Sequence, residues 1–182
     1  MFQNRISNPA LRGFVEWVLV IGLALLLAFL TRAFLFRVTR VTGYSMEPSF
    51  SEGDFLVLNR FSYLFNDPQV GDVVAFPYPG DPDYYFIKRI VAQGGDVVDI
   101  INGQFVINGA PLDDPFSHEL LTAPWNVNFP LTVEAGRFFV LGDNRNGSRD
   151  SRNVTVGNIQ GEDMIGRVFV RIWPFSTFGR VE

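Results

Sequence analysis

The stretch Phe138-Phe-Val-Leu-Gly-Asp-Asn-Arg-Asn-Gly-Ser-Arg-Asp-Ser-Arg152 joins a short apolar run to a dense group of charged and polar side chains. Its first four residues have the length and composition of a buried strand. The following residues include two Asp and three Arg, which could hold a loop rigid by ion pairs while turning Ser hydroxyls inward. A solvated surface loop is the ordinary interpretation of so polar a segment, but this mixture of acids and bases argues against it.

Short apolar runs of the same kind recur through the chain after residue 36. Each is bounded by Gly, Pro, Asp or Asn, which is typical of strands separated by turns. Two Asn-Gly pairs, Asn102-Gly103 and Asn108-Gly109, lie beside β-branched residues and predict hairpins. The body is therefore predicted to be mainly β, with residues 108–136, which are richer in Pro, Asp and Asn, as a small inserted lobe. The apolar runs are Phe55–Leu58, Val73–Phe76, Phe86–Val91, Val97–Ile101, Phe105–Ile107, Phe138–Leu141 and Met164–Trp173.

Upstream of this body lies an apolar segment of 19 residues, 13–31, in which Glu16 is the only charge. At 1.5 Å per residue a helix of that length covers about 28 Å, which matches the hydrocarbon core of a bilayer. We therefore predict one transmembrane helix over about residues 13–35. A cleaved signal peptide is the alternative, because Thr31-Arg32-Ala33 loosely fits a small-x-small site. The Arg residues that flank the segment are nearly balanced and do not set its orientation.

Composition excludes several classes of protein and of site. The net charge of −4 argues against a nucleic-acid binder, and the absence of Cys removes disulfides, thiolate metal sites and a Cys nucleophile. The chain holds one lysine, Lys88, and one histidine, His118, so no pair of His ligands exists. Arg stays protonated, so any nitrogen base must be one of these two residues. We expect neither a metal nor a cofactor.

Two further segments hold residue types that could catalyse a reaction. Val41-Thr-Gly-Tyr-Ser-Met-Glu-Pro-Ser49 places a Ser between a Gly and a Pro, where a backbone turn could direct a hydroxyl and an amide toward one space. A turn-forming Ser is the ordinary alternative. Tyr85–Ala92 places the lysine in a strand pattern in which Phe86, Lys88 and Ile90 share a face. Burial would lower the pKa of that amine and make it a competent base, whereas an exposed strand edge is the ordinary alternative.

Taken together, in this order and behind an apolar span, the three segments resemble type I signal peptidases, the membrane-anchored Ser-Lys proteases. The family's Ser-Met-x-Pro-Thr box corresponds to Ser45-Met-Glu-Pro-Ser49, and its Lys-Arg-x-x-Ala/Gly box with a following Gly-Asp corresponds to Lys88–Ala92 and Gly95-Asp96. The box Gly-Asp-Asn-Arg-x-x-Ser-x-Asp-Ser-Arg fits Gly142–Arg152 at every fixed position. The resemblance covers residues 14–173. It implies a mainly β, signal-peptidase/LexA-like β fold with one N-terminal transmembrane helix and a small inserted lobe.

The resemblance also implies roles for individual residues. Ser45 matches the nucleophile, and its backbone N–H matches one oxyanion donor. Lys88 matches the general base, and Ser148 matches a serine that hydrogen-bonds to the lysine amine and orients it. Some members carry a Ser two residues before the nucleophile that completes the oxyanion hole. This chain has Gly43 there, so the Gly43 amide or a water is the candidate second donor.

Two ion pairs and two pocket residues follow from the same resemblance. The expected structural pairs are Arg89 with Asp143 and Arg152 with Asp150. Val41 and Ile87 match walls of shallow apolar pockets that accept small substrate residues at −1 and −3, with the substrate bound as an added strand. A surface role is expected for His118.

The expected organisation is a cytoplasmic tip and anchor helix in residues 1–36, followed by an extracytoplasmic catalytic β domain in residues 37–182. The implied enzyme is a single-pass serine endopeptidase of the cell membrane that cleaves signal peptides from preproteins after a small-x-small motif. We expect it to act as a monomer, with preprotein signal peptides and the lipid bilayer as partners and no nucleic acid. The alternatives are a related Ser-Lys regulatory protease and a membrane-anchored β binding or assembly module without catalysis.

Overall fold

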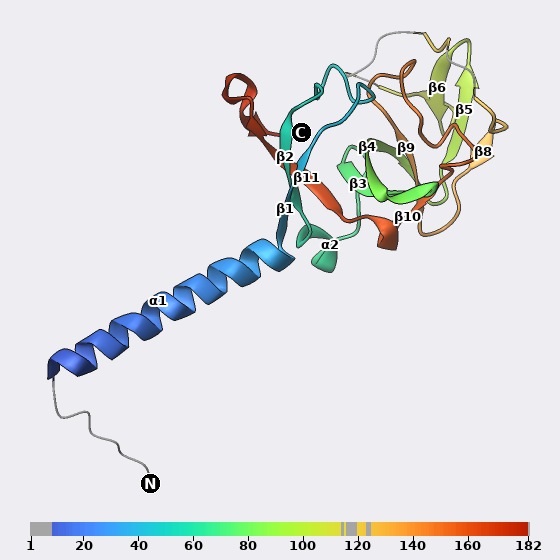
Figure 1. Cartoon of the computed structure of the whole chain (residues 1–182). Helices are drawn as coiled ribbons and strands as arrows, with labels where there is room; N and C mark the ends of the chain where they lie inside the picture. Colours follow the sequence, from blue (N-terminus) through green and yellow to red (C-terminus); the bar gives the residue numbers. More distant parts are fainter. Residues whose placement is uncertain (1–8, 114, 116–119, 123–124, 182) are drawn as a thin grey trace. The chain divides into compact units, whose positions relative to one another are not determined.

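The computed structural model describes residues 9–113, 115, 120–122 and 125–181 (Figure 1). The chain divides into two compact units, residues 1–36 and residues 37–182. The first unit contains the helix α1 (Pro9–Phe34), whose window Arg12–Phe29 has a mean hydropathy of 2.0 and is long and apolar enough to cross a membrane. Its Glu16 pairs with Arg12 at 2.9 Å, one helical turn away. The helix begins at Pro9, a few residues before the predicted start at residue 13.

The second unit is built on a sheet that, among the described residues, has eight strands. The order is β1-β2-β11-β3-β4-β9-β10, and β12 pairs with β11 beside that path. The long strand β4 is an inner strand of this sheet, paired antiparallel with β3 on one side and with β9 on the other. The strands of this sheet are β1 (Phe36–Arg40), β2 (Phe55–Asn59), β3 (Val73–Tyr78), β4 (Asp81–Gln93), β9 (Arg137–Leu141), β10 (Ile159–Gln160), β11 (Gly166–Trp173) and β12 (Gly179–Arg180).

A smaller sheet of the order β7-β6-β5-β8 lies at the opposite end of this unit from β2 (Figure 1). Both predicted hairpins are confirmed, because β5 pairs with β6 and β6 with β7 around the two Asn-Gly turns. Asn102 and Asn108 have φ of 52° and 53°, and the following glycines also have positive φ, as two-residue hairpin turns require. The four strands are β5 (Val97–Ile101), β6 (Gln104–Ile107), β7 (Ala110–Pro111) and β8 (Leu131–Thr132). Residues 108–136 thus supply the outer strands, while β5 and β6 precede them.

The remaining helical segments are short: α2 (Ser62–Phe65), η1 (Gly161–Asp163) and η2 (Phe175–Thr177). Hydrophobic packing covers both faces of the main sheet. Along β3, Val73 and Ala75 pack into one buried cluster and Val74 and Phe76 into another, as the two-residue period of a strand requires. A third cluster joins the end of β4 to the smaller sheet. The prediction of a mainly β chain with one long N-terminal helix is confirmed.

Candidate active site

Ser45 lies in a tight turn that follows β1, and buried neighbours fix that turn. The N–H of Glu47 donates to the carbonyl of Tyr44 at 3.2 Å, and the N–H of Phe50 donates to that of Met46 at 2.9 Å. Met46 and Phe50 are both 2% exposed and pack in the same core cluster, so the turn cannot shift without disturbing the core. Ser45 itself is half-buried, and its neighbour Tyr44 is exposed.

Lys88 lies in the middle of β4 and directs its amine at that turn. Its Nζ is 2.7 Å from Ser45 Oγ and donates a second hydrogen bond to the carbonyl of Ile87 at 2.9 Å. The side chain is buried, with 3% of the residue exposed. The structure thus gives the only lysine a buried place in contact with the serine hydroxyl, and the alternative of an exposed strand edge is wrong.

Burial lowers the pKa of Lys88 from 10.5 to about 8, because the ammonium form loses its hydration. The carboxylates of Asp150 and Asp143 partly oppose this by raising the pKa, and Arg152 adds to the lowering. At a pH near that value about half of the amines are neutral and can accept a proton. The amine is therefore suited to remove the proton of the hydroxyl that it touches.

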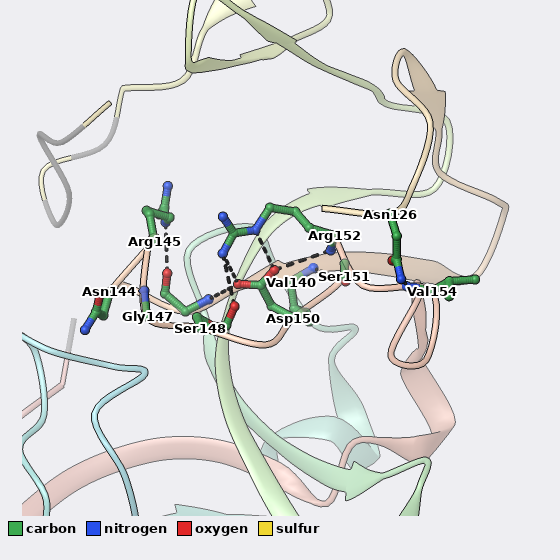
Figure 2. Close-up of polar contacts among 11 residues, drawn as sticks. Asn126, Val140, Asn144, Arg145, Gly147, Ser148, Asp150, Ser151, Arg152 and Val154 are labelled. Atoms are coloured by element: carbon green, nitrogen blue, oxygen red, sulfur yellow. Dashed lines mark hydrogen bonds and ion pairs between the residues drawn. The ribbon is translucent and has the colours of Figure 1, made fainter. Parts of the chain in front are cut away.

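Both predicted acid–base pairs lie together beside this amine. Arg89 holds Asp143 through two hydrogen bonds of 2.8 and 2.9 Å. Arg152 holds Asp150 through two hydrogen bonds of 2.7 and 2.8 Å, which Figure 2 shows. All four residues are at most 4% exposed. Such bidentate buried pairs fix the loop that follows β9. Within this segment the Arg152–Asp150 pair is formed, and Arg89 of β4 holds the other Asp, Asp143.

Ser148 lies in the same loop, but its hydroxyl is buried without a hydrogen-bond partner among the described residues. The expected contact to the lysine amine is thus not formed in this structure, and the orienting role of Ser148 stays a prediction. A side chain at Gly142 would collide with Ser148 Oγ and with the carbonyl of Ser45. The absence of a side chain at Gly142 therefore lets the Ser148 loop lie against the serine turn.

The two pocket candidates border the same turn with different exposure. Val41 is 5% exposed and belongs to the core cluster that contains Met46, whereas Ile87 is half-buried and packs against that cluster. Ile87 therefore offers more side-chain surface beside Ser45 than Val41 does. His118 lies outside the described residues. No group of three or more His, Cys, Asp or Glu that could hold a metal occurs in the part of the chain that the structure describes.

Sequence reasoning gave no role to two side chains that hold the site together. Ser49 donates a hydrogen bond of 2.6 Å from its hydroxyl to Asp143. Asn144 donates from its side chain to the carbonyl of Tyr44 and from its backbone N–H to the carbonyl of Ser45, both at 3.1 Å. For Ser49 the sequence did hold a signal, because the Thr of the family box carries the same hydroxyl. Nothing comparable identified the partner of Asn144.

The chain is similar to known proteins over most of its length. The chain matches the family model described as "Signal peptidase, peptidase S26" over residues 14–173. It is 32% identical to signal peptidase I of Leptolyngbya laminosa over 98% of this chain and 87% of that protein. It is 35% identical to probable signal peptidase I-1 of Synechocystis, over 91% and 86% of the two chains, and 30% identical to signal peptidase IB of Staphylococcus aureus, over 90% and 92%.

A solved structure of signal peptidase I from Enterococcus faecalis is also similar, with 28% identity and a TM-score of 0.48, covering 57% of this chain and 97% of that one. The relatives do not favour the alternative of a binding or assembly module without catalysis. The family model and the relatives each cover most of the chain, including all three motif segments. The chain therefore belongs to the signal peptidase family, peptidase S26, with the serine endopeptidase activity of a signal peptidase I.

Proposed function

We propose that this signal peptidase cleaves preproteins with Ser45 as the nucleophile and Lys88 as the general base. The observation that carries the proposal is the 2.7 Å contact between a buried amine and the Ser45 hydroxyl. A serine hydroxyl is a weak nucleophile until an adjacent base takes its proton. Within the described residues, the other cations are Arg side chains, which do not give up a proton.

The reaction follows from these two groups. Neutral Lys88 takes the Ser45 proton as Oγ attacks the scissile carbonyl carbon, and an acyl ester forms when the ammonium returns that proton to the departing amine. A water activated by the neutral amine then hydrolyses the ester. The N–H groups of Ser45 and Gly43 donate to no described residue, so both are available to bind the oxyanion of each tetrahedral intermediate.

Three further features support the lysine in this scheme. The Arg89–Asp143 and Arg152–Asp150 pairs act as structural ties that fix the strand and the loop around Lys88. Ser148 orients the amine when its buried hydroxyl turns toward it, which would also give that hydroxyl a partner. Buried hydroxyls without a partner are uncommon, so the unsatisfied state favours such a contact during the reaction.

The substrate is proposed to bind as an added strand along β4. Along its length β4 pairs with β3 from Asp81 to Arg89, but β9 pairs with it only from Arg89 to Gln93. On the β9 side, the part of β4 that precedes Arg89 thus has no strand partner among the described residues. An extended peptide on that edge would bring its backbone to Lys88. Ile87 and Val41 would then face the small residues at −1 and −3, so that cleavage follows a small-x-small motif.

The arrangement in the membrane is also proposed. Residues 1–36 form a cytoplasmic tip and a spanning helix in the lipid bilayer, and residues 37–182 form the catalytic domain outside the cytoplasm, as a monomer. The length and apolar composition of α1 support the span. Protease added to sealed inverted and right-side-out vesicles tests the orientation, because the catalytic domain should be digested only in right-side-out ones. Digestion only in inverted vesicles would show the opposite topology.

The catalytic proposal is tested with the full chain in detergent and a preprotein substrate. The wild type should release a mature protein whose new amino terminus follows a small-x-small motif, and Ser45→Ala should release none. Ser51→Ala is the matched control, since Ser51 is exposed in the same region and should leave cleavage unchanged. Cleavage retained by folded Ser45→Ala would refute the nucleophile.

A further inference from the structure

We infer that Asn144 is a positioning residue that holds the oxyanion-binding N–H of Ser45 in its working direction. The inference rests on the proposed function of Ser45. The peptide group between Tyr44 and Ser45 contains both the carbonyl that Asn144 contacts and the N–H that would bind the oxyanion. Because a peptide group is rigid, the hydrogen bond from Asn144 to the carbonyl also sets the direction of the Ser45 N–H.

The carbonyl of that peptide group is held from two sides. Asn144 Nδ2 donates to the Tyr44 oxygen at 3.1 Å, and the backbone N–H of Glu47 donates to the same oxygen at 3.2 Å. One donor comes from within the serine turn and the other from the loop after β9. Two donors from separate segments fix the direction of a carbonyl more tightly than one donor can.

Fixing the carbonyl also fixes the N–H. The peptide bond between Tyr44 and Ser45 is trans, since the cis bonds in the described part of the chain precede Pro48, Pro130 and Pro174. In a planar trans peptide the N–H points opposite to the C=O. The Ser45 N–H consequently points away from Asn144 and from Glu47, and it donates to no described residue. An unpaired donor on a clamped peptide is what a preformed oxyanion site requires.

The clamp is itself well held. The backbone N–H of Asn144 donates to the carbonyl of Ser45 at 3.1 Å, so Asn144 holds the carbonyl on each side of the nucleophile. Its Oδ1 accepts a hydrogen bond of 2.9 Å from the N–H of Gly147, which sets which end of the amide faces Tyr44 (Figure 2). A Cβ added at Gly147 would lie 2.7 Å from Asn144 Nδ2. The glycine thus leaves space for the amide in this orientation.

The loop does not depend on this side chain for its place. Asp143, the preceding residue, is anchored by Arg89 and by the hydroxyl of Ser49. Removal of the Asn144 amide should therefore free the Tyr44–Ser45 peptide to rotate while the loop and its ion pairs remain. Such a loss affects the transition state more than the bound substrate, because the oxyanion exists only after attack.

The experiment compares Asn144→Ala, Asn144→Asp, Asn146→Ala and Ser45→Ala as purified full-length chains cleaving one preprotein. Asp keeps an oxygen for the Gly147 N–H but has no donor for Tyr44. Asn146 is the matched control, because its side chain contacts Leu120 and Thr122 and not the serine turn. Rates are measured at about pH 9.5, where Lys88 is mostly neutral, and across the pH profile.

We expect Asn144→Ala to lower kcat about 10- to 100-fold with little change in KM, and Asn144→Asp to lower it at least as much. The rise of kcat/KM with pH should keep its position in Asn144→Ala, and Asn146→Ala should retain near wild-type kcat. Wild-type kcat in Asn144→Asp would assign the side chain to loop capping and overturn the inference. Wild-type kcat in Asn144→Ala, or a pH profile displaced in that variant, would also overturn it. Activity in Ser45→Ala would instead overturn the proposed nucleophile.

Discussion

Lys88 and Arg89 are consecutive residues of β4 with nearly equal burial, 3% and 4% exposed, yet their surroundings differ completely. Arg89 holds Asp143 through two hydrogen bonds and donates a third, of 3.0 Å, to the carbonyl of Gly71. Lys88 forms no ion pair with any described carboxylate and donates to a hydroxyl and a carbonyl. The comparison teaches that burial alone does not create a base. A lysine amine that is buried without a carboxylate partner can release its proton, whereas a guanidinium keeps its proton in any setting and here balances the charge of a buried carboxylate.

The largest expected effect is the loss of cleavage when Lys88, the cation without a carboxylate partner among the described residues, is replaced. Lys88→Met should lower cleavage by about 10²- to 10⁴-fold, because Ser45 loses its base. Lys88→Arg should be equally inactive, since a guanidinium keeps its proton. Both are measured as the rate of preprotein cleavage by protein that elutes and melts as a folded species. Substantial cleavage by folded Lys88→Arg would contradict the role of the amine as a base.

Arg89, which is paired with Asp143, should matter for stability and not for cleavage. Arg89→Met leaves Asp143 buried without its partner and should lower the free energy of unfolding by about 3–5 kcal/mol. The protein that remains folded should still cleave, because Arg89 contacts neither Ser45 nor Lys88 through its guanidinium. Denaturant titration measures the stability, and Arg89→Met combined with Asp143→Leu should recover part of it. A fully stable but inactive Arg89→Met variant would contradict this division of roles.

Lys88 should also destabilise the fold. Its pKa is 10.5 in the unfolded chain and about 8 in the folded one, so the unfolded state binds the proton more tightly. The penalty is complete below pH 8 and disappears as the pH rises to 10.5, which makes the wild type more stable with rising pH over that window. Lys88→Met should therefore be more stable by up to about 3 kcal/mol near neutral pH. A gain that stays constant up to pH 10.5 would show that packing causes it.

The sequence predicts that Lys88 and Arg89 point to opposite faces of the sheet, but it does not predict what surrounds either side chain. Strand alternation predicts that Lys88 and Arg89 face opposite ways, and the packing of Phe86 and Ile90 in one cluster and of Ile87 in another confirms it. Local chemistry likewise predicts the hairpin turns. Whether the lysine is buried could not be predicted from β4 alone, because its cover comes from the serine turn, 43 residues earlier in the chain.

Distances between segments were the main quantity that the sequence could not supply. The motif placed Ser148 near the lysine but could not show that its hydroxyl would have no partner among the described residues. Asn144 was visible only as a fixed position of a motif, since its hydrogen-bond acceptor, the carbonyl of Tyr44, lies 100 residues away and belongs to the backbone. Backbone acceptors leave no trace in residue type, so contacts of this kind need coordinates.

The smallest expected effect tests whether the neighbouring ion pair adjusts the pKa of Lys88. The carboxylate of Asp150 raises that pKa and the guanidinium of Arg152 lowers it. Asp150→Asn removes a negative charge, so the rise of kcat/KM with pH should move to lower pH. Arg152→Gln removes a positive charge and should move the rise to higher pH. Each variant also breaks a buried pair and should be less stable than the wild type.

The two variants should move the pH profile in opposite directions, which distinguishes an effect of charge from an effect of loop position. A loop that merely loosened in both variants would expose Lys88 to water and raise its pKa in both, which moves both profiles to higher pH. Arg180→Gln provides a control for net charge, because Arg180 is an exposed residue of β12 that stacks on Phe169. Its profile should coincide with that of the wild type. Displacement of Asp150→Asn to higher pH would show that the pair acts on Lys88 through the position of the loop and not through its charges.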